Sequence, residues 1–546
     1  MHSLHIDERD TVRIALRDLA AGTPIRHGAR TIVLPETIPA KHKLLLHDQP
    51  AGSPVVMYGV VVGLLTVGLR AGQRLTTERI ANATDTYGPW DGPPPAWPAP
   101  DVTRWRQRTF RGYHRADGRV GTANHWLVFP LVFCENRNVE RLRELLLDPL
   151  GYGPGGGGAQ GLGEMISAAA RGDRQTVLST TLHLPTATTT TGRVFPNVDG
   201  LRFLTHEAGC GGTRQDARSL CRLLAGYVDN PNVAGATVLS LGCQNAEVEY
   251  FRSLLRGDKP VYIIDHQYSG GQEDYLTAAV RHTLLGLGEA NRAERQPAPP
   301  SRLTLGLECG GSDGFSGISA NPVLGRVSDM LVALGGSAIL AEFPELAGVE
   351  GELIARCRHR EDAERFARLM QTYGAAAEAV GSGFKDNPSP GNIRDGLVTD
   401  AMKSAGAARK GGSSPITGVL EYGFTPSPAA PPGLRLLCTP GNDVESTTAL
   451  AGAGANLIVF TTGLGTPTGN PVAPVVKVSS NSALAERMPD LIDFDAGTVV
   501  RGKQSVAAAA DQLLELLLRV ASGETVPRAE HNQQYDFIPW KQGISL

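Results

Sequence analysis

Four cysteines follow segments whose composition is typical of buried strands, and their surroundings suggest metal chemistry. Cys134 follows the apolar run Leu127–Phe133, and the other three lie beside glycines, in THEAGCGG (Cys210), LSLGCQNAE (Cys243) and GLECGGSDGFSG (Cys309). In open α/β sheets the ligand crevice lies at the strand ends, where glycine lets a metal approach the backbone closely. We therefore predict that Cys134, Cys210, Cys243 and Cys309 converge at the crevice between two domains and bind iron, either as Fe2+ or as an iron–sulfur cluster.

The alternative for each single cysteine is a small, buried apolar side chain with no ligand. The sequence contains no CxxC pair, so the spacing of the cysteines does not decide between the two interpretations.

Three residues beside these cysteines are candidate catalytic groups. His206 stands four residues before Cys210, and its imidazole is suited to act as a base or a ligand, or equally to form a hydrogen bond within a loop. Ser312 and Asp313 follow Cys309. Asp313 is expected to orient a ligand or to act as a base, and the alternative is a structural cap of a helix that starts near Ser312.

Several further loops are dense in small polar side chains, and most of them follow an apolar segment. Hydroxyls, amides and backbone N–H groups in such loops suit a polyhydroxylated ligand, which needs many donors and acceptors. The predicted substrate-binding residues are Ser316, Asn321, Asn392, Lys403, Ser413, Asn442, Asp443 and Thr466.

Composition limits the classes of partner. The 546 residues carry a formal net charge of -3, which does not favour nucleic acid. The longest apolar stretch, Val55–Leu69, is too short for a membrane helix and is interrupted by glycines. The first residues contain no apolar segment typical of a signal peptide, and seven cysteines in so long a chain do not suggest a disulfide framework. We expect a cytoplasmic protein with a small-molecule partner, and the sequence leaves a homo-oligomer open.

The elements that must position these residues fall into four segments. Residues 1–85 alternate short β-branched runs with turns, and the proline-rich stretch 86–105 predicts an extended linker. Residues 106–295 and 302–546 each alternate apolar strands with amphipathic helices, which predicts two α/β domains with mostly parallel sheets. In the last segment, strands are expected at Leu303–Leu307 and Ala338–Glu342, and helices at Leu353–Tyr373 and Val506–Ala521. The glycine-rich stretch 151–163 lacks the Lys-Ser/Thr ending of a phosphate loop and is expected to be a flexible loop.

At its motifs the chain resembles the altronate/galactarate dehydratase family of sugar-acid hydro-lyases. The matching stretches include FRGYHRADGRVGT, HEAGC, LGCQN, LECGGSDGFSGISANPVLGRVSD, NPSPGN, TPGND and GTPTGNPVAPVVKVSSNS. The resemblance implies a small N-terminal β-clip (SAF-like) module followed by the two α/β domains. It also implies a dehydration that depends on divalent iron, in which a proton beside a carboxylate is removed and a β-hydroxyl leaves.

The chain departs from the family pattern at several positions. Where the family usually has a run of histidines at the end of the small module, the chain has Arg74, Thr76, Glu78 and Arg79. Ala123, Ile393 and Leu464 stand where the family tends to have cations, and Gln244 stands where it has glutamate. We therefore expect the module to be tethered by the linker and to contribute little to catalysis, and we expect an uncharged substrate.

Three functions follow from these residues. The first is a metal-dependent dehydratase of a polyhydroxylated, sugar-like substrate that is a neutral sugar derivative or nucleoside. The second is a sugar-acid dehydratase, which the retained cations Lys385, Arg394, Lys403, Lys410 and Lys477 keep open. The third is a binding protein that has lost catalysis. A fold alone does not choose among them, because chemistry depends on the site.

Overall fold

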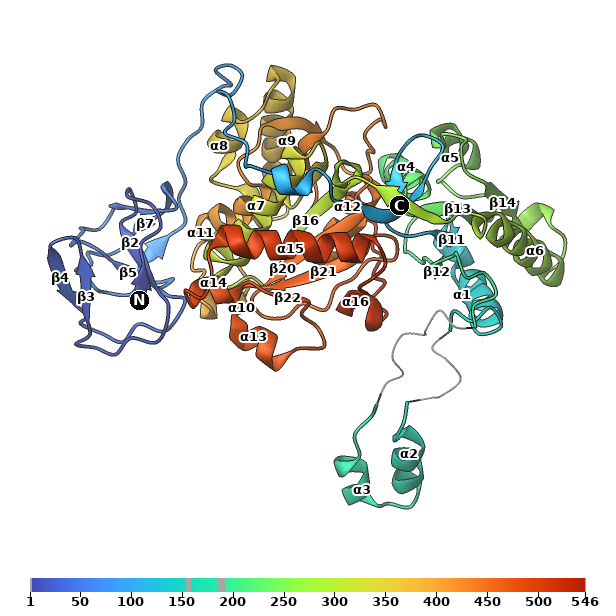
Figure 1. Cartoon of the computed structure of the whole chain (residues 1–546), viewed down its shortest axis with the longest axis horizontal. Coiled ribbons are helices and arrows are strands. Elements are labelled where there is room, and N and C mark those ends of the chain that lie inside the picture. Colours follow the sequence, from blue (N-terminus) through green and yellow to red (C-terminus); the bar gives the residue numbers. More distant parts are fainter. Residues whose placement is uncertain (1, 154–158, 184–191, 546) are drawn as a thin grey trace.

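The computed structural model describes residues 2–153, 159–183 and 192–545. It consists of an N-terminal β module and two α/β domains, which confirms the predicted fold class (Figure 1). The predicted loop 151–163 lies partly outside the described residues, because 154–158 are not among them. The proline-rich stretch forms no helix or strand before the short 3-10 helix η1 (Thr103–Trp105).

The N-terminal module is built from short antiparallel strands in three small sheets, with the orders β1-β2-β5, β3-β4 and β6-β7-β8. The strands are β1 (Ser3–Leu4), β2 (Val12–Ala15), β3 (Pro24–His27), β4 (Arg30–Val33), β5 (Lys43–Leu45), β6 (Pro54–Met57), β7 (Val60–Leu65) and β8 (Ile80–Ala81).

The module is docked on the C-terminal domain, which corrects the expectation that it is merely tethered. Its buried Val12 and Val55 belong to the same apolar cluster as Leu305 of the C-terminal domain. The Thr399 hydroxyl also donates to the carbonyl of Val62 at 2.7 Å. Burial of apolar surface of this kind is the main stabilising contribution to domain docking.

The second domain contains a four-stranded parallel sheet in the order β12-β11-β13-β14. Helices α2 and α3 pack on each other and lie apart from the rest of the domain (Figure 1). The parallel strands are β11 (His125–Pro130), β12 (Gly200–Phe203), β13 (Val233–Ser240) and β14 (Val261–Asp265). An antiparallel sheet combines β9 (Phe110–His114), β10 (Val120–Gly121) and β15 (Arg295–Ala298). The helices are η2 (Phe133–Glu135), α1 (Asn136–Leu146), α2 (Leu162–Ala170), α3 (Arg174–Ser179), α4 (Arg214–Asp229), α5 (Val248–Leu254), η3 (His266–Tyr268) and α6 (Gln272–Ala290).

The C-terminal domain contains a seven-stranded parallel sheet in the order β18-β19-β17-β16-β20-β21-β22. The strands are β16 (Thr304–Cys309), β17 (Ser337–Leu340), β18 (Ile416–Leu420), β19 (Gly433–Leu437), β20 (Leu457–Thr462), β21 (Val475–Ser479) and β22 (Phe494–Asp495). Because all seven run parallel, their carboxyl ends and the loops that follow them meet at one edge, where ligands bind in such sheets.

Helices cover this sheet, and α4 of the second domain packs against α12 to join the two α/β domains. The α-helices are α7 (Ala320–Ala333), α8 (Glu350–Ala355), α9 (Arg360–Ala379), α10 (Pro390–Arg394), α11 (Asp400–Ala407), α12 (Asp443–Gly452), α13 (Ser482–Arg487), α14 (Gly497–Val500), α15 (Val506–Ala521) and α16 (Arg528–His531). The 3-10 helices are η4 (Pro300–Arg302), η5 (Ser316–Ile318), η6 (Phe343–Leu346), η7 (Phe384–Asp386) and η8 (Ala408–Gly411). Among the described residues, no helix has both the length and the apolar character needed to cross a membrane.

Candidate active site

Four carboxylates and one thiol meet where β16 and β17 end. We call Glu308, Cys309, Glu342, Glu345 and Asp443 the acidic centre. The ligand atoms of Cys309, Glu342 and Glu345 lie within 4.8 Å of one another, and so do those of Glu308, Glu342 and Asp443. The pairing of β16 with β17 produces this arrangement, because it places the end of one strand beside the loop that follows the other.

Two buried lysines lie among these anions. Lys410 Nζ is 2.6 Å from Cys309 Sγ and 2.7 Å from Glu342 Oε2, and Lys403 Nζ is 2.8 Å from Glu345 Oε1. Burial alone would lower the pKa of each ammonium, but the surrounding anionic groups raise both pKa values above the usual range. Both lysines are therefore cationic at neutral pH.

Burial and mutual repulsion set the protonation of the carboxyl groups. Burial, then the neighbouring Glu342, raises the pKa of Glu308 well above its usual value. Burial, then Glu342 and Glu345, raises the pKa of Asp443 to about 7. Although burial raises the pKa of Glu345, Lys403 and the second lysine hold it below its usual value. A carboxyl group whose pKa is near 7 is suited to proton transfer at neutral pH.

The backbone at the acidic centre is specialised. A Cβ on Gly310 would lie 2.0 Å from Asp443 Oδ2, so glycine is required for that carboxylate to approach the end of β16. Glu342 has a φ of 67°, a left-handed conformation that is costly for a residue with a side chain. Its N–H donates to the hydroxyl of Thr439 at 2.8 Å, which helps to hold the conformation.

The donor set of the acidic centre fits a divalent cation. Glu308 Oε1 and Glu342 Oε1 are buried and have no hydrogen-bond partner among the residues that the structure describes. Buried carboxyl oxygens without a partner are unfavourable, and a bound cation would compensate them. Carboxylate oxygens suit Mg2+, Mn2+ or Fe2+, and a single thiolate is compatible with iron.

Asp313, a predicted catalytic residue, forms hydrogen bonds and an ion pair with residues of several loops. Its side chain is fully buried. Oδ1 accepts hydrogen bonds from the hydroxyls of Ser316 at 3.0 Å and Ser480 at 2.7 Å. Oδ2 accepts from the Asn481 amide at 3.0 Å and lies 3.1 Å from Lys41 Nζ. The Asp313 carboxylate therefore joins three loops, one of which belongs to the N-terminal module.

The N-terminal module places cations beside Asp313. Lys41 pairs with Asp395 as well as with Asp313. Lys43 is buried and donates to the carbonyl of Gly396 at 2.6 Å, and burial lowers its pKa to about 7. Arg74, at the start of the segment that replaces the family's histidines, forms a β-bridge with Leu44 and so lies beside these lysines.

The other predicted polar residues mostly shape the loops. Ser312 is buried, and its carbonyl accepts from the Asn392 amide at 2.7 Å. The Asn321 amide donates to the carbonyl of Gly406, and the Asn442 side chain caps the start of α12. The carbonyl of Thr466 accepts from Lys477, whose pKa burial lowers to about 7.

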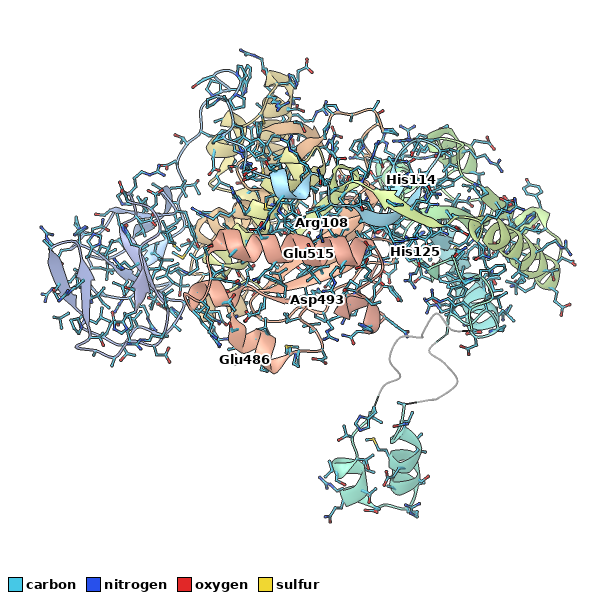
Figure 2. The ribbon with its side chains drawn as sticks, in the orientation of Figure 1. Arg108, His114, His125, Glu486, Asp493 and Glu515 are labelled. Atoms are coloured by element: carbon cyan, nitrogen blue, oxygen red, sulfur yellow. The ribbon has the colours of Figure 1, made fainter. Side chains whose placement is uncertain are left out.

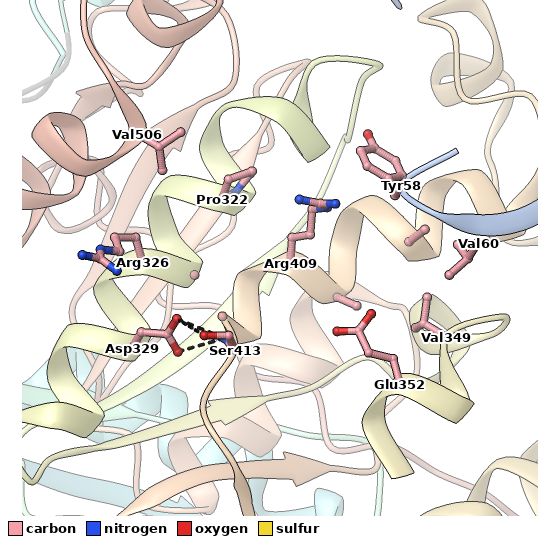
Figure 3. A pocket seen from close by; sticks show the side chains of 14 residues that line it. Tyr58, Val60, Pro322, Arg326, Asp329, Val349, Glu352, Arg409, Ser413 and Val506 are labelled. Atoms are coloured by element: carbon pink, nitrogen blue, oxygen red, sulfur yellow. Dashed lines mark hydrogen bonds between the residues drawn. The ribbon is translucent and has the colours of Figure 1, made fainter. Parts of the chain in front are cut away.

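Ser413 lies away from the acidic centre. It donates to the carboxylate of Asp329 at 2.8 Å in a separate cavity of about 360 Å³, whose lining also includes Tyr58 and Arg409 (Figure 3). No described hydrogen bond links Ser413 to the acidic centre.

His206 has a structural environment in the second domain. It is buried, its Nδ1 accepts from the N–H of Ala208 at 3.2 Å, and its Nε2 lies 2.8 Å from the carbonyl of Pro130. These contacts assign the proton to Nε2 and occupy both ring nitrogens. Burial lowers the pKa of His206 to about 4, so the ring is neutral.

Three of the four predicted cysteine ligands share one edge of the second-domain sheet. Cys134, Cys210 and Cys243 are exposed and follow the neighbouring strands β11, β12 and β13. Backbone hydrogen bonds join their loops, from the N–H of Phe133 to the carbonyl of Ala208 and from Asn245 to Gly209. We call these the cysteine loops. Cys309, in contrast, is buried in the acidic centre, where its sulfur contacts Glu345 and Lys410.

Residue patterns did not predict Glu308, Glu342 and Glu345 as functional residues. Glu308 is part of the quoted block LECGGSD, and Glu342 and Glu345 follow a predicted strand in the run AEFPEL. These residues could have been predicted from one signal, a carboxylate at or directly after the end of a buried strand, since side chains in that position face a ligand. Lys41 carried no signal, because its role depends on the docking of the module.

Three family models match successive parts of the chain. The family model for the altronate/galactarate dehydratase SAF domain matches residues 1–83, that for the D-galactarate dehydratase/altronate hydrolase second domain matches 112–291, and that for the D-galactarate/altronate dehydratase C-terminal domain matches 300–545.

Full-length relatives agree with the family models. The chain is 31% identical to altronate dehydratase from Escherichia coli (strain K12) over 546 residues, a match that covers 100% of both proteins. It is 31% identical to altronate dehydratase from Bacillus subtilis (strain 168) over 544 residues, covering 100% of this chain and 99% of the relative. It is 30% identical to galactarate dehydratase (L-threo-forming) from Escherichia coli (strain K12), covering 98% and 96%. The chain therefore belongs to the altronate/galactarate dehydratase family of hydro-lyases.

Proposed function

We propose that the protein dehydrates a polyhydroxylated sugar acid in the crevice between the acidic centre and the N-terminal module. The observation that carries this proposal is the pairing of Lys403 and Lys410 with buried carboxylates where β16 and β17 end. Lys41 of the N-terminal module pairs with the buried Asp313, four residues beyond the end of β16. Relatives named for altronate and galactarate favour an acid over the neutral substrate that the lost cations suggested. The lysines, together with Arg74 at the module, supply positive charge that Ala123, Ile393 and Leu464 do not.

The chemistry requires one base and one acid. Asp443, with a pKa of about 7, takes the proton from the carbon beside the substrate carboxylate, and the C–H electrons move into that carboxylate. The bond from the β-carbon to its hydroxyl then breaks. The ammonium of Lys410 gives this hydroxyl a proton, so that it leaves as water, and Lys403 holds the substrate carboxylate as a point charge.

We further propose iron as the cofactor, held as Fe2+ by Glu308, Cys309, Glu342 and Glu345, which leaves Asp443 as the base. Bound there, it would act as a Lewis acid on substrate oxygens. The cysteine loops are the place for an iron–sulfur cluster. The sulfurs of Cys134, Cys210 and Cys243 are not among the described ligand groups whose atoms lie within 4.8 Å of one another. Three thiolates bound to a single ion, each at about 2.3 Å, would lie that close together, so these cysteines suit a cluster and not a single ion. A homo-oligomer and a cytoplasmic location remain predictions, to be tested by light scattering and by cell fractionation.

The test is an assay of the anaerobic, iron-loaded protein against altronate, galactarate and a neutral sugar alcohol, with formation of the dehydrated keto acid as the readout. The expected result is turnover of at least one acid at about 1 per second or faster. Turnover of the neutral compound alone would contradict the acid substrate. Absence of all turnover and of bound iron would support a binding protein instead.

A further inference from the structure

A large cavity lies apart from the acidic centre, none of whose residues line it. It has a volume of about 1050 Å³ and lies between the second domain, the end of α15 and the C-terminal segment. His125, the first residue of β11, and Pro474, just before β21, line it, so it lies at the amino ends of the strands (His125 is labelled in Figure 2). Reactions in parallel α/β sheets take place at the carboxyl ends. The cavity is therefore separate from the proposed reaction crevice.

Arginines dominate the charge of this cavity. Arg193, Arg202 and Arg295 all line it, and Arg295 is paired with Asp199 at 3.1 Å. Within the described part of the chain, neither Arg193 nor Arg202 forms an ion pair. The guanidinium of Arg202 lies 3.8 Å from the centre of the Tyr535 ring. These contacts hold the cation in place without neutralising it.

The remaining acidic side chains of the cavity only partly offset these cations. Asp536 accepts a hydrogen bond from the N–H of Gly469 at 2.8 Å. Glu530 also lines the cavity, and burial raises its pKa although the nearby Arg202 lowers it. Arg143 also lines the cavity and is paired with Glu140 at 3.1 Å. The lining therefore holds four arginines against the three carboxyl groups of Asp199, Glu530 and Asp536, and among the described residues Arg193 and Arg202 are the lining arginines without an ion pair.

Polar atoms in the cavity also lack partners. Arg193 Nε, Thr525 Oγ1 and Gln534 Oε1 are buried and have no hydrogen-bond partner among the described residues. Gly200 reserves space for the guanidinium of Arg202, since a Cβ there would lie 2.7 Å from the guanidinium carbon. A ligand that carries both an oxyanion and hydroxyl groups would satisfy these atoms, and the planar fork of arginine matches carboxylate and phosphate oxygens.

We propose that this arginine cavity binds a small organic oxyanion, a carboxylate or a phosphate ester that also carries hydroxyl groups, as a second ligand site outside the reaction crevice.

The C-terminal segment connects the cavity to the rest of the protein. Gln534 and Tyr535 line the cavity, and Asp536 bonds the loop that contains Thr466. A few residues later, Trp540 lies in a small pocket with Cys210. A ligand that fixes the segment at Gln534 is therefore linked to the Thr466 loop and to the pocket that contains Cys210.

The test is isothermal titration of the whole protein with inorganic phosphate and, separately, with citrate, at constant ionic strength. Saturable binding is expected in the wild type. It should weaken at least about tenfold in Arg193→Gln and in Arg202→Gln, and stay unchanged in Arg171→Gln, which removes an exposed arginine beyond α2. Binding of phosphate alone would identify a phosphate ester, binding of citrate alone a polycarboxylate, and either supports the site.

Two results would overturn the proposal. One is the absence of saturable binding of both probes up to about 10 mM. The other is binding that is equally strong in the glutamine variants but lost in Lys410→Met, which would place the anion at the acidic centre. Because Arg202 packs on Tyr535, circular dichroism must show that its variant is folded. If that variant is unfolded, Arg193→Gln decides the question.

Discussion

Asp443 is the residue whose protonation should control the rate. Replacing it by asparagine keeps its size and removes the base, so kcat should fall by about 10²–10⁴-fold. In the wild type, kcat/KM should rise as the pH increases through about 7, because the base must be deprotonated to act. The variant should lose this rise. Asn442→Ala is the matched control, since Asn442 only caps α12 and should affect melting temperature more than the pH profile. An unchanged pH profile in Asp443→Asn would remove Asp443 from the mechanism.

Lys41 tests whether the N-terminal module takes part in the site. Lys41→Ala leaves the fully buried Asp313 without its cation, so we expect kcat/KM to fall by about 10–100-fold, and Lys41→Arg to restore part of the loss. Lys503→Ala, which removes an exposed lysine of the same type, should have wild-type activity. Full activity of Lys41→Ala would support the expectation from the sequence that the module contributes little to catalysis.

At the residue scale, the sequence predicted part of the site. Asp443 and Lys403 were expected to bind substrate and do lie in or beside the acidic centre. Glu342 was missed because its role depends on two facts that no local pattern contains. These are the pairing of β17 with β16 and a left-handed backbone at a residue with a side chain. Cys309 was grouped with the other cysteines because all four follow strands, but strand ends in different sheets need not meet.

At the element scale, the cysteine loops give a separate prediction. Anaerobic reconstitution with iron and sulfide should produce visible charge-transfer absorption and acid-labile sulfide, because three thiolates can hold a cluster. Cys210→Ser should abolish both, whereas Cys221→Ser, a buried cysteine within α4, should retain them. If the wild type binds iron without sulfide, and Cys210→Ser binds the same amount, the iron belongs to the acidic centre alone.

The elements themselves follow from periodicity where it is strong. The helix expected over Val506–Ala521 is α15 with the same bounds, and the strand expected over Leu303–Leu307 is β16, which begins at Thr304 and continues to Cys309. The helix expected over Leu353–Tyr373 is instead divided into α8 and α9. There Cys357 and Ile416 form a β-bridge, a long-range pairing that interrupts the helix and that a local window cannot detect.

At the scale of the whole molecule, docking of the module should make stability depend on pH. Lys43 is buried at this junction, and its pKa of about 7 is far below the ordinary value of 10.5. Between these values the unfolded chain binds a proton that the folded chain does not, so the free energy of unfolding rises with pH from about 7 to about 10.5. The buried acid Asp400, with a raised pKa of about 8, opposes this rise below that pH. The buried thiols of Cys221, Cys357 and Cys438, whose pKa values burial raises from 9.0 to about 12, oppose it above about pH 9, so the Lys43 contribution is the difference from a variant without its ammonium.

The measurement is the free energy of unfolding by denaturant between about pH 8 and 10. The wild type should gain stability across this range, and Lys43→Met should show a smaller gain, because methionine removes the titrating group and keeps the apolar stem. Lys503→Met serves as the exposed control. Equal slopes in wild type and Lys43→Met would show that the ammonium is solvated and that the junction is open.

The docked module also bears on how the protein is made. Lys41 is synthesised early, but its partner Asp395 is 354 residues further along the chain. At about 5–20 residues per second, roughly 20–70 s of translation separate the two. During that interval the nascent module exposes apolar residues such as Val12 and Val55, which later join the apolar cluster of the C-terminal domain. The growing chain should therefore depend on holding chaperones until its C-terminal half emerges, and ribosome-bound intermediates should carry no activity.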